Sequence, residues 1–119
     1  GASVNILYVG GNETQAAYEQ TIRAELTAKY PGIRIEFYLP GWNSSWNIHL
    51  DKVRPLVQRA DVVVLSTMVR TQFGRHVRKM CDADTAWLAC TGRGKQSLLS
   101  SIERAAIWSA ERKQRERIQ

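Results

Sequence analysis

Three short segments of the chain place glycine, hydroxyl or basic residues just ahead of an expected helix. They are Gly10-Gly11-Asn12, Thr67 with Arg70-Thr71, and Gly92-Arg93-Gly94-Lys95. The N-terminus of a helix offers unpaired N–H groups and about half a positive charge, and a guanidinium forms two hydrogen bonds with one phosphate. The segments therefore predict a site for an anionic ligand. Its predicted residues are Gly10, Gly11, Asn12, Thr67, Arg70, Thr71, Arg93 and Lys95.

Each segment also has a plainer structural explanation. Two adjacent glycines allow a turn that needs a positive φ, and Thr71 serves equally well as a helix N-cap. The first segment lacks the Gly-x-Gly-x-x-Gly pattern of dinucleotide sites, and the second strand ends in Leu39-Pro40 without an acidic residue for a ribose. The third has Ala89 and Gln96 where a nucleoside-triphosphate loop needs Gly and Ser or Thr. The motifs argue against NAD binding and an ATPase, and leave phosphate contact open.

Side chains suited to catalysis are sparse near these segments. No nucleophile, base and orienting acid fall together at one strand end, and Glu13 is the only acidic residue in the turns that border the expected site. Ser66 and Thr67 lack the Gly-x-Ser-x-Gly pattern of a hydrolase nucleophile. We therefore expect a non-catalytic module without a cofactor.

The cysteines and histidines do not form the pattern of a metal site. Cys81 and Cys90 are spaced unlike a Cys-x-x-Cys pair, and His49 and His76 do not complete a ligand set. We expect buried thiols in a reducing compartment. His76 is expected to be partly buried at the border of the apolar face of its helix, and His49 has no evident partner.

The net charge of +6 is concentrated in the second half of the chain. Residues 1–60 hold six basic and five acidic residues, whereas residues 61–119 hold eleven and six. This balance favours an anionic partner, although a solvated basic face explains most charge runs. The alternative function is nucleic-acid binding by a basic surface. Its predicted residues are Arg75, Arg78, Lys79, Arg93 and Lys95.

Two tryptophans, Trp42 and Trp46, lie in a polar segment that is read as a loop. Exposed tryptophans anchor interfaces or stack on bases, but these two are equally suited to folding over the edge of a sheet. Both interpretations stay open.

Hydrophobic periodicity predicts four strands alternating with four helices. The β-branched run Val62 to Leu65 is typical of a central strand covered on both faces, and the alternation from Ile33 to Leu39 is typical of an edge strand. Pro55 conflicts with a helix at 49–60, so that helix either begins near Asp51 or is kinked. The expected strands span 4–9, 33–39, 61–66 and 85–90, and the helices 15–30, 49–60, 71–82 and 96 onward. The first helix is expected to be capped by Asn12 or Thr14.

Right-handed crossovers between these strands predict an α/β fold of three layers, Rossmann-like or flavodoxin-like, with a parallel sheet of order 2-1-3-4. Ligands then gather at the crevice beyond the ends of the first and third strands. We expect one domain at 4–110, an expression scar at 1–3 and a polar helical tail at 111–119. The longest apolar run is too short to cross a membrane, so a cytoplasmic protein is expected.

Several segments within residues 4–102 form a combined pattern. They are Ile6 to Gly11, Ala60 to Leu65, Thr67 with Val69, Val77 to Cys81, and Ser97-Leu98 after a glycine-containing turn. Together they resemble the bacterial domain-of-unknown-function family 2325. The resemblance implies a Rossmann-like fold and a C-terminal place in longer proteins. That family usually has Ser-His where Arg70-Thr71 stands and lysine where Arg78 stands, so no histidine chemistry is carried over.

The leading hypothesis is a binding or sensing module that recognises a small phosphorylated, nucleotide-like ligand in the crevice. The second is a nucleic-acid-binding domain, and the third is an enzyme domain that needs acidic or metal-binding groups from a partner. The expected partners are an anionic small molecule or nucleic acid and other domains of a parent protein, without a membrane. A homo-oligomer is left open.

Overall fold

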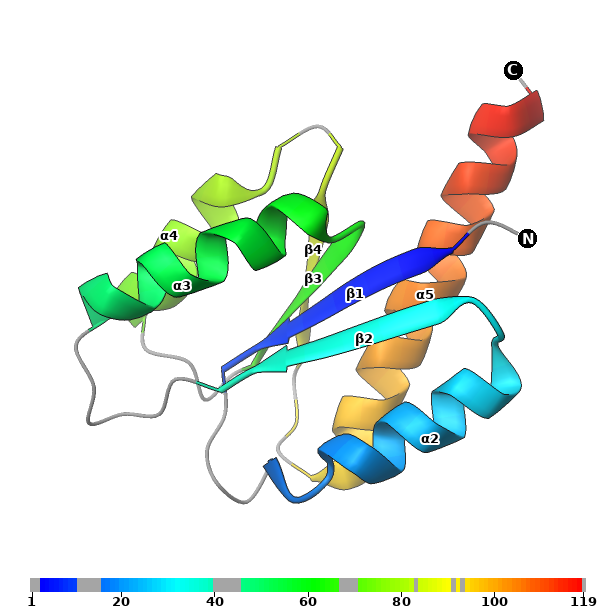
Figure 1. Cartoon of the computed structure of the whole chain (residues 1–119), viewed down its shortest axis with the longest axis horizontal. Coiled ribbons are helices and arrows are strands. Elements are labelled where there is room, and N and C mark those ends of the chain that lie inside the picture. Colours follow the sequence, from blue (N-terminus) through cyan, green and yellow to red (C-terminus); the bar gives the residue numbers. More distant parts are fainter. Residues whose placement is uncertain are drawn as a thin grey trace.

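The chain folds into three layers, with helices on both faces of one sheet (Figure 1). This computed structural model describes residues 3–10, 16–39, 46–66, 71–82, 84–90, 92 and 94–118. The strands are β1 (Val4–Val9), β2 (Ile33–Tyr38), β3 (Val62–Ser66) and β4 (Ala86–Cys90). The helices are α2 (Glu19–Lys29), α3 (Trp46–Arg59), α4 (Thr71–Met80) and α5 (Lys95–Ile118). α3 and α4 cover one face of the sheet, and α2 and α5 cover the other.

The sheet is parallel, in the order β2-β1-β3-β4, which confirms the predicted fold class and strand order. All five residues of β3 are buried, as the unbroken apolar run predicted. In β2, Ile33 and Ile35 are buried while Arg34 and Glu36 are exposed, which is the alternation expected of an edge strand. Because the first and third strands lie side by side, their connections leave in opposite directions.

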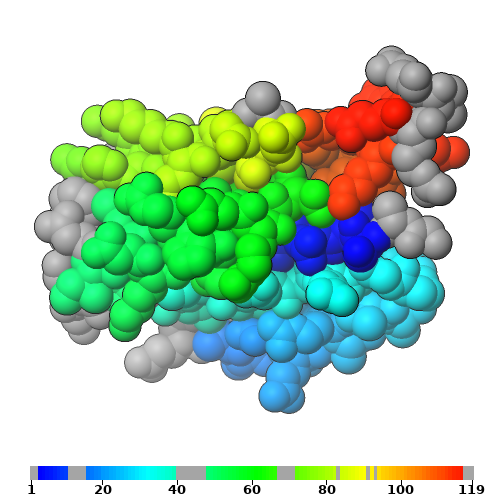
Figure 2. All heavy atoms as spheres, turned by 45° about the horizontal axis from the view of Figure 1, so that its top comes forward, coloured from blue at the N-terminus to red at the C-terminus, as the bar shows by residue number. Residues whose placement is uncertain are grey.

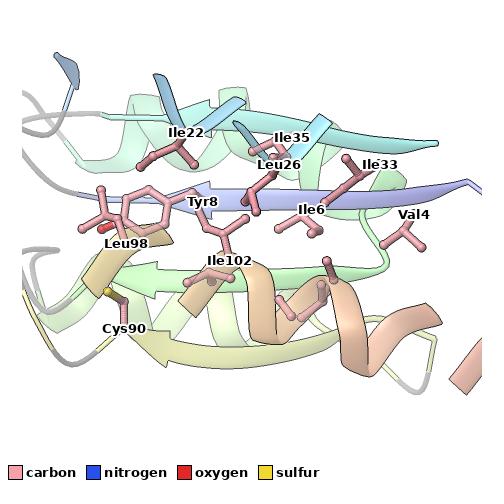
Figure 3. Packing of buried hydrophobic residues seen from close by; sticks show 14 residues of the cluster. Val4, Ile6, Tyr8, Ile22, Leu26, Ile33, Ile35, Cys90, Leu98 and Ile102 are labelled. Atoms are coloured by element: carbon pink, nitrogen blue, oxygen red, sulfur yellow. The ribbon is translucent and has the colours of Figure 1, made fainter. Parts of the chain in front are cut away.

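Two hydrophobic clusters hold the helices to the sheet, one on each face. β1 supplies both, because successive side chains of a strand point to opposite faces: Ile6 and Tyr8 join one cluster, Leu7 and Val9 the other. Figure 3 shows side chains of β1, β2, α2 and α5 meeting around Tyr8 on the first of these faces. Tyr8 is fully buried, and its ring centroid lies 5.4 Å from that of Phe37.

Helix α3 begins earlier than predicted and continues through its proline. It spans Trp46–Arg59 with Pro55 inside, so a start near Asp51 is wrong. Proline lacks an N–H and removes the single bond to the carbonyl four residues earlier, and the exposed position of Pro55 leaves that carbonyl near solvent. Val53 and Val57 still face the core, as predicted.

Helix α2 begins at Glu19 rather than near Gln15. Its N-cap is Tyr18, which makes no side-chain capping bond. The predicted caps, Asn12 and Thr14, lie outside the described part of the chain. Periodicity located the buried face correctly at Ile22 and Leu26 but could not locate the start.

Helix α5 is long and continues through residues 111–118, the predicted polar helical tail. Figure 1 shows that its end extends past the start of β1. There Lys113 donates to the carbonyl of Ser3, and its Nζ lies 3.0 Å from Oδ2 of Asp61. The same carboxylate oxygen accepts a bond of 2.8 Å from the N–H of Asn5. The last helix is thereby tied to the beginnings of β1 and β3.

None of the helices in the described ranges is long and apolar enough to cross a membrane.

Candidate functional site

The four strands end along one side of the sheet, which we call the carboxyl edge. It is formed by the last strand residues Val9, Tyr38, Ser66 and Cys90. The register pairs Val9 with Leu65, and Ser66 with Cys90, so β1, β3 and β4 end at nearly the same level. In a parallel α/β fold the following helices begin here, and their N-termini point unpaired N–H groups toward this edge. All predicted ligand-binding residues follow these strand ends in the sequence.

Only part of the predicted site can be placed. Gly10 has a φ of 105°, is buried, and donates a hydrogen bond of 2.9 Å from its N–H to the carbonyl of Tyr38. The expected positive φ is therefore confirmed at this glycine. Thr71 is the first residue of α4, and Lys95 is the first residue of α5. The side chain of Thr71 and the residues Gly11, Asn12, Thr67, Arg70 and Arg93 lie outside the described part of the structure.

The two glycines before α5 have different roles. A Cβ added at Gly92 would collide with Cβ and Oγ of Ser97, so this glycine is required by the packing of the turn against the helix. A Cβ at Gly94 would meet no atom within 4 Å. The carbonyl of Gly94 accepts the first helical bond, 3.1 Å from the N–H of Leu98. The space beside Gly94 is therefore open where a Cβ would stand, and Lys95 next to it is exposed.

Three of the helices that begin at the carboxyl edge carry no negative charge in their first turn. None of α3, α4 and α5 has an acidic residue in its first turn, where Asp and Glu are normally favoured by the helix dipole. Lys95 at the start of α5 opposes that dipole directly. Helix α2 differs from these three helices, because Glu19 lies in its first turn. Three helix N-termini thus lack the side-chain anions that usually accompany them.

The sequence did not reveal a hydrogen-bonded pair at this edge. Tyr38, the last residue of β2, places its Oη 2.6 Å from Nδ1 of His49 in the first turns of α3. The His49 ring also contacts Phe73 edge-on, with centroids 6.4 Å apart. A usable signal was present: one residue ends a strand, the other follows the start of the next helix, and both positions belong to the same edge.

The surroundings of this pair keep both groups uncharged. Burial lowers the pKa of His49, and the nearby charge of Lys52 lowers it further. Burial raises the pKa of Tyr38. Because the phenol keeps its proton, we assign Tyr38 as the donor and Nδ1 as the acceptor, which leaves the hydrogen of the His49 ring on Nε2. The pair supplies a neutral N–H donor rather than a charge.

The two thiols differ in burial. Both cysteines are free. Cys90 is fully buried, as expected, whereas Cys81 is only partly buried. Burial, with a smaller effect of Asp82, raises the pKa of Cys81 to about 11, so its reactive thiolate is scarce at neutral pH. In the described ranges no group of three His, Cys, Asp or Glu side chains is arranged to hold a metal ion.

The predicted nucleic-acid residues divide between two layers. Arg75, Arg78 and Lys79 lie exposed on α4, whereas Lys95 begins α5 on the opposite face of the sheet. The structure adds Trp87 of the edge strand β4, which is 42% exposed. The guanidinium carbon of Arg78 lies 5.3 Å from the centroid of the Trp87 ring. We call these four residues the α4–β4 surface.

Trp46 is the first residue of α3, so the predicted loop ends before it. The side chain of Trp46 and the whole of Trp42 lie outside the described residues, so both interpretations of the two tryptophans stay predictions. His76 is intermediate in exposure, as predicted.

No protein-family model, no curated protein and no solved structure matches this chain. The resemblance to the bacterial family of unknown function therefore stays a prediction.

Proposed function

We propose that this domain is a non-catalytic module that binds a small phosphorylated ligand at the carboxyl edge. The observation that carries the proposal is Lys95. It stands at the start of a long helix, where its charge opposes the dipole, beside open space at Gly94. A cation held in an unfavourable place for stability is typical of a binding site, because a bound anion reverses the sign of its contribution.

The positions of the strand ends set the size of the ligand. Gly10 follows β1 and Lys95 follows β4, and β3 lies between these two strands. Neighbouring strands are about 4.8 Å apart, so the ends of β1 and β4 are separated by about 10 Å. A nucleotide or a phosphorylated sugar is long enough to contact residues that follow both strands. The neutral Tyr38–His49 pair offers a donor to the uncharged part of such a ligand.

The test compares Lys95→Ala and Lys95→Glu with Lys79→Ala, an exposed lysine of α4 that lies outside the proposed site. Thermal shifts are measured with a nucleoside monophosphate, a sugar phosphate and inorganic phosphate as probes. A charge-assisted bond contributes about 1.5–3 kcal/mol, so both Lys95 variants should bind about ten- to a hundredfold more weakly.

Lys95→Glu should at the same time melt at a higher temperature than the parent without ligand, because it replaces an unfavourable charge near the helix N-terminus by a favourable one. Lys79→Ala should bind like the parent. A probe that stabilises all variants equally would place the site elsewhere, and failure of every probe to stabilise the parent would remove the proposal.

A second candidate function, binding of single-stranded nucleic acid, is favoured by the α4–β4 surface. Arg78 and the exposed Trp87 ring form a cation–π contact, and Arg75 and Lys79 add charge on the same helix. α4 contains no acidic residue. Bases stack on exposed aromatic rings while basic side chains follow the phosphates, which is the chemistry of sequence-tolerant single-strand binding.

This candidate is tested by fluorescence anisotropy of a labelled oligonucleotide at several salt concentrations. Trp87→Ala should weaken binding without changing the salt dependence, and Arg78→Ala should reduce the slope of log K against log salt by about 0.7, the value for one phosphate contact with a single strand. Lys52→Ala, an exposed lysine of α3, is the control. Absence of binding at low salt would exclude this function.

A further inference from the structure

A polar cavity of about 220 Å³ lies at the side of the sheet where the strands begin, opposite the carboxyl edge. Its walls come from the residue before β3, the turn before β4 and the second half of α5. Figure 2 shows the turn, in yellow, beside this part of α5, in orange-red. The lining residues are Asp61, Asp84, Ser109, Arg112, Lys113 and Glu116. We call this region the Ser109 cavity.

Ser109 forms the inner wall of this cavity. It is 2% exposed, whereas Asp84 and Glu116 are exposed at the mouth. Its hydroxyl oxygen is the only buried side-chain nitrogen or oxygen in the described part of the chain that has no hydrogen-bond partner. A serine inside a helix normally bonds to the carbonyl four residues earlier or reaches solvent, and an unpaired buried polar atom is rare. This atom therefore indicates a bound molecule that completes its hydrogen bonding.

The two basic side chains of the cavity are already engaged with acidic ones. Nζ of Lys113 lies 3.0 Å from Oδ2 of Asp61. Nε of Arg112 lies 3.2 Å from Oε1 of Glu116, and its guanidinium lies over the Trp108 ring. An anionic ligand would have to compete with Asp61 and Glu116 for these cations.

Asp84 is the charged lining residue whose carboxylate has no ion pair or hydrogen bond among the described residues. Its backbone is held in place: its N–H donates a bond of 2.8 Å to Oδ1 of Asp82, and Oγ1 of the next residue, Thr85, donates one of 3.2 Å to the carbonyl of Ala60. Arg115 of α5 is exposed and does not line the cavity. The unpaired carboxylate, rather than the total charge of this region, therefore decides the sign of the ligand.

We propose that the Ser109 cavity binds a small alkylamine that carries a second polar group. The ammonium group donates to the carboxylate of Asp84 at the mouth, and the second group, a hydroxyl or amine, bonds to the hydroxyl of Ser109 at the inner wall. The cavity equals the volume of about seven water molecules, which limits the ligand to about seven heavy atoms. A metal ion is not favoured, because the described residues contain no group of three His, Cys, Asp or Glu arranged to hold one.

This site is independent of the function proposed for the carboxyl edge. Lys95 and Ser109 are 14 residues apart on α5, or about 21 Å at 1.5 Å per residue. Failure of phosphorylated probes would remove the proposed function and leave this inference standing, and failure of amines would do the reverse.

The experiment measures thermal shifts of the whole chain at pH 7 in an amine-free buffer, with ethanolamine and putrescine as probes. Both are protonated at this pH, because alkylamines have pKa values of about 10. Ethylene glycol is the matched neutral probe, and sodium chloride controls for ionic strength. The amines should raise the Tm at millimolar concentrations, and the glycol should bind at least about tenfold more weakly.

Two variants test the two contacts. Asp84→Asn should weaken ethanolamine binding about tenfold or more, and Ser109→Ala about two- to tenfold. Without ligand, Ser109→Ala should melt at or above the parent temperature, because it removes an unpaired buried polar atom. The matched controls are Asp51→Asn, an exposed carboxylate of α3, and Ser100→Ala, an exposed serine of α5. Both should respond like the parent.

Amide resonances in two-dimensional NMR spectra locate the bound amine. Ethanolamine should shift the amides of Asp84, Ser109 and Lys113 and leave that of Lys95 unchanged. A parent that does not respond to either amine overturns the proposal. So does an equal response in Asp84→Asn, or an equal response to ethylene glycol, which would mean that the cavity holds water or a neutral hydroxyl compound. Ser109→Ala melting well below the parent would also overturn it, because the hydroxyl would then have a partner within the fold.

Discussion

Replacement of Pro55 by alanine should stabilise the protein by an amount that the structure allows us to work out. Pro55 lies inside the 14-residue helix α3 and is exposed. In a helix interior proline is about 3 kcal/mol less favourable than alanine, because it removes one hydrogen bond and its ring opposes the preceding turn. Proline also restricts the unfolded chain, which returns about 0.4–1 kcal/mol. The expected net gain for Pro55→Ala is about 2 kcal/mol.

This gain is large enough to measure by two methods. An unfolding entropy of about 2.1 cal/mol/K per residue, applied to this chain, converts 2 kcal/mol into a rise in Tm of about 8 °C. With a urea m-value of about 2 kcal/mol/M, the midpoint of urea unfolding should rise by about 1 M. Gln58→Ala, also exposed on α3, controls for a change of surface residue and should alter stability by less than about 0.5 kcal/mol.

The result that would refute the reasoning is a Tm for Pro55→Ala at or below that of the parent. It would mean that α3 does not continue through this position as a regular helix. A rise of equal size in Gln58→Ala would also refute it, because the gain would then not come from the proline.

Three further predictions follow from the core, the edge and the thiols. Val63→Asp should abolish the cooperative melt, because it leaves an unpaired charge in a strand that is fully buried, whereas a melt near the parent temperature would contradict the central place of β3. His49 has a folded pKa below its ordinary 6.5, so the unfolded state binds the proton first and stability should decline as pH falls from about 7 toward 5. This decline should be smaller in His49→Gln, and Tyr38→Phe should lower the Tm at pH 7, where the pair is intact. Alkylation at pH 8 should be slow at Cys81 and Cys90 in the folded protein and fast at both in urea, as measured by mass spectrometry.

The fold was predictable because the hydrophobic pattern of each strand depends on its place in the sheet. Val62 to Leu65 are apolar on both faces since β3 is covered by helices on both faces, and β2 alternates because it lies at an edge. The inward face of α3 was also predictable, because its apolar residues recur at helical spacing. Its start was not, because periodicity describes which side of a helix is buried and carries no information on where the helix begins.

The candidate site was predictable in location and only partly in detail. That ligand groups follow the strand ends is a property of any parallel α/β sheet, so Gly10, Thr71 and Lys95 could be assigned to one edge from their order in the chain. The Tyr38–His49 bond depends on how the segment between them returns to the sheet. The exposure of Trp87 depends on how far α4 covers β4. Neither the Tyr38–His49 bond nor the exposure of Trp87 can therefore be predicted from the neighbouring residues in the sequence.

The tie between Lys113, Asp61 and the beginning of β1 gives α5 a mechanical role. Lys95 and Lys113 are separated by about 27 Å along the same helix, at 1.5 Å per residue. The helix therefore acts as a rigid rod whose first turn faces the carboxyl edge and whose far end is pinned to the chain's first strand. One element thus reaches both edges of the sheet, with its first turn beyond the strand ends and its last turns against the start of β1.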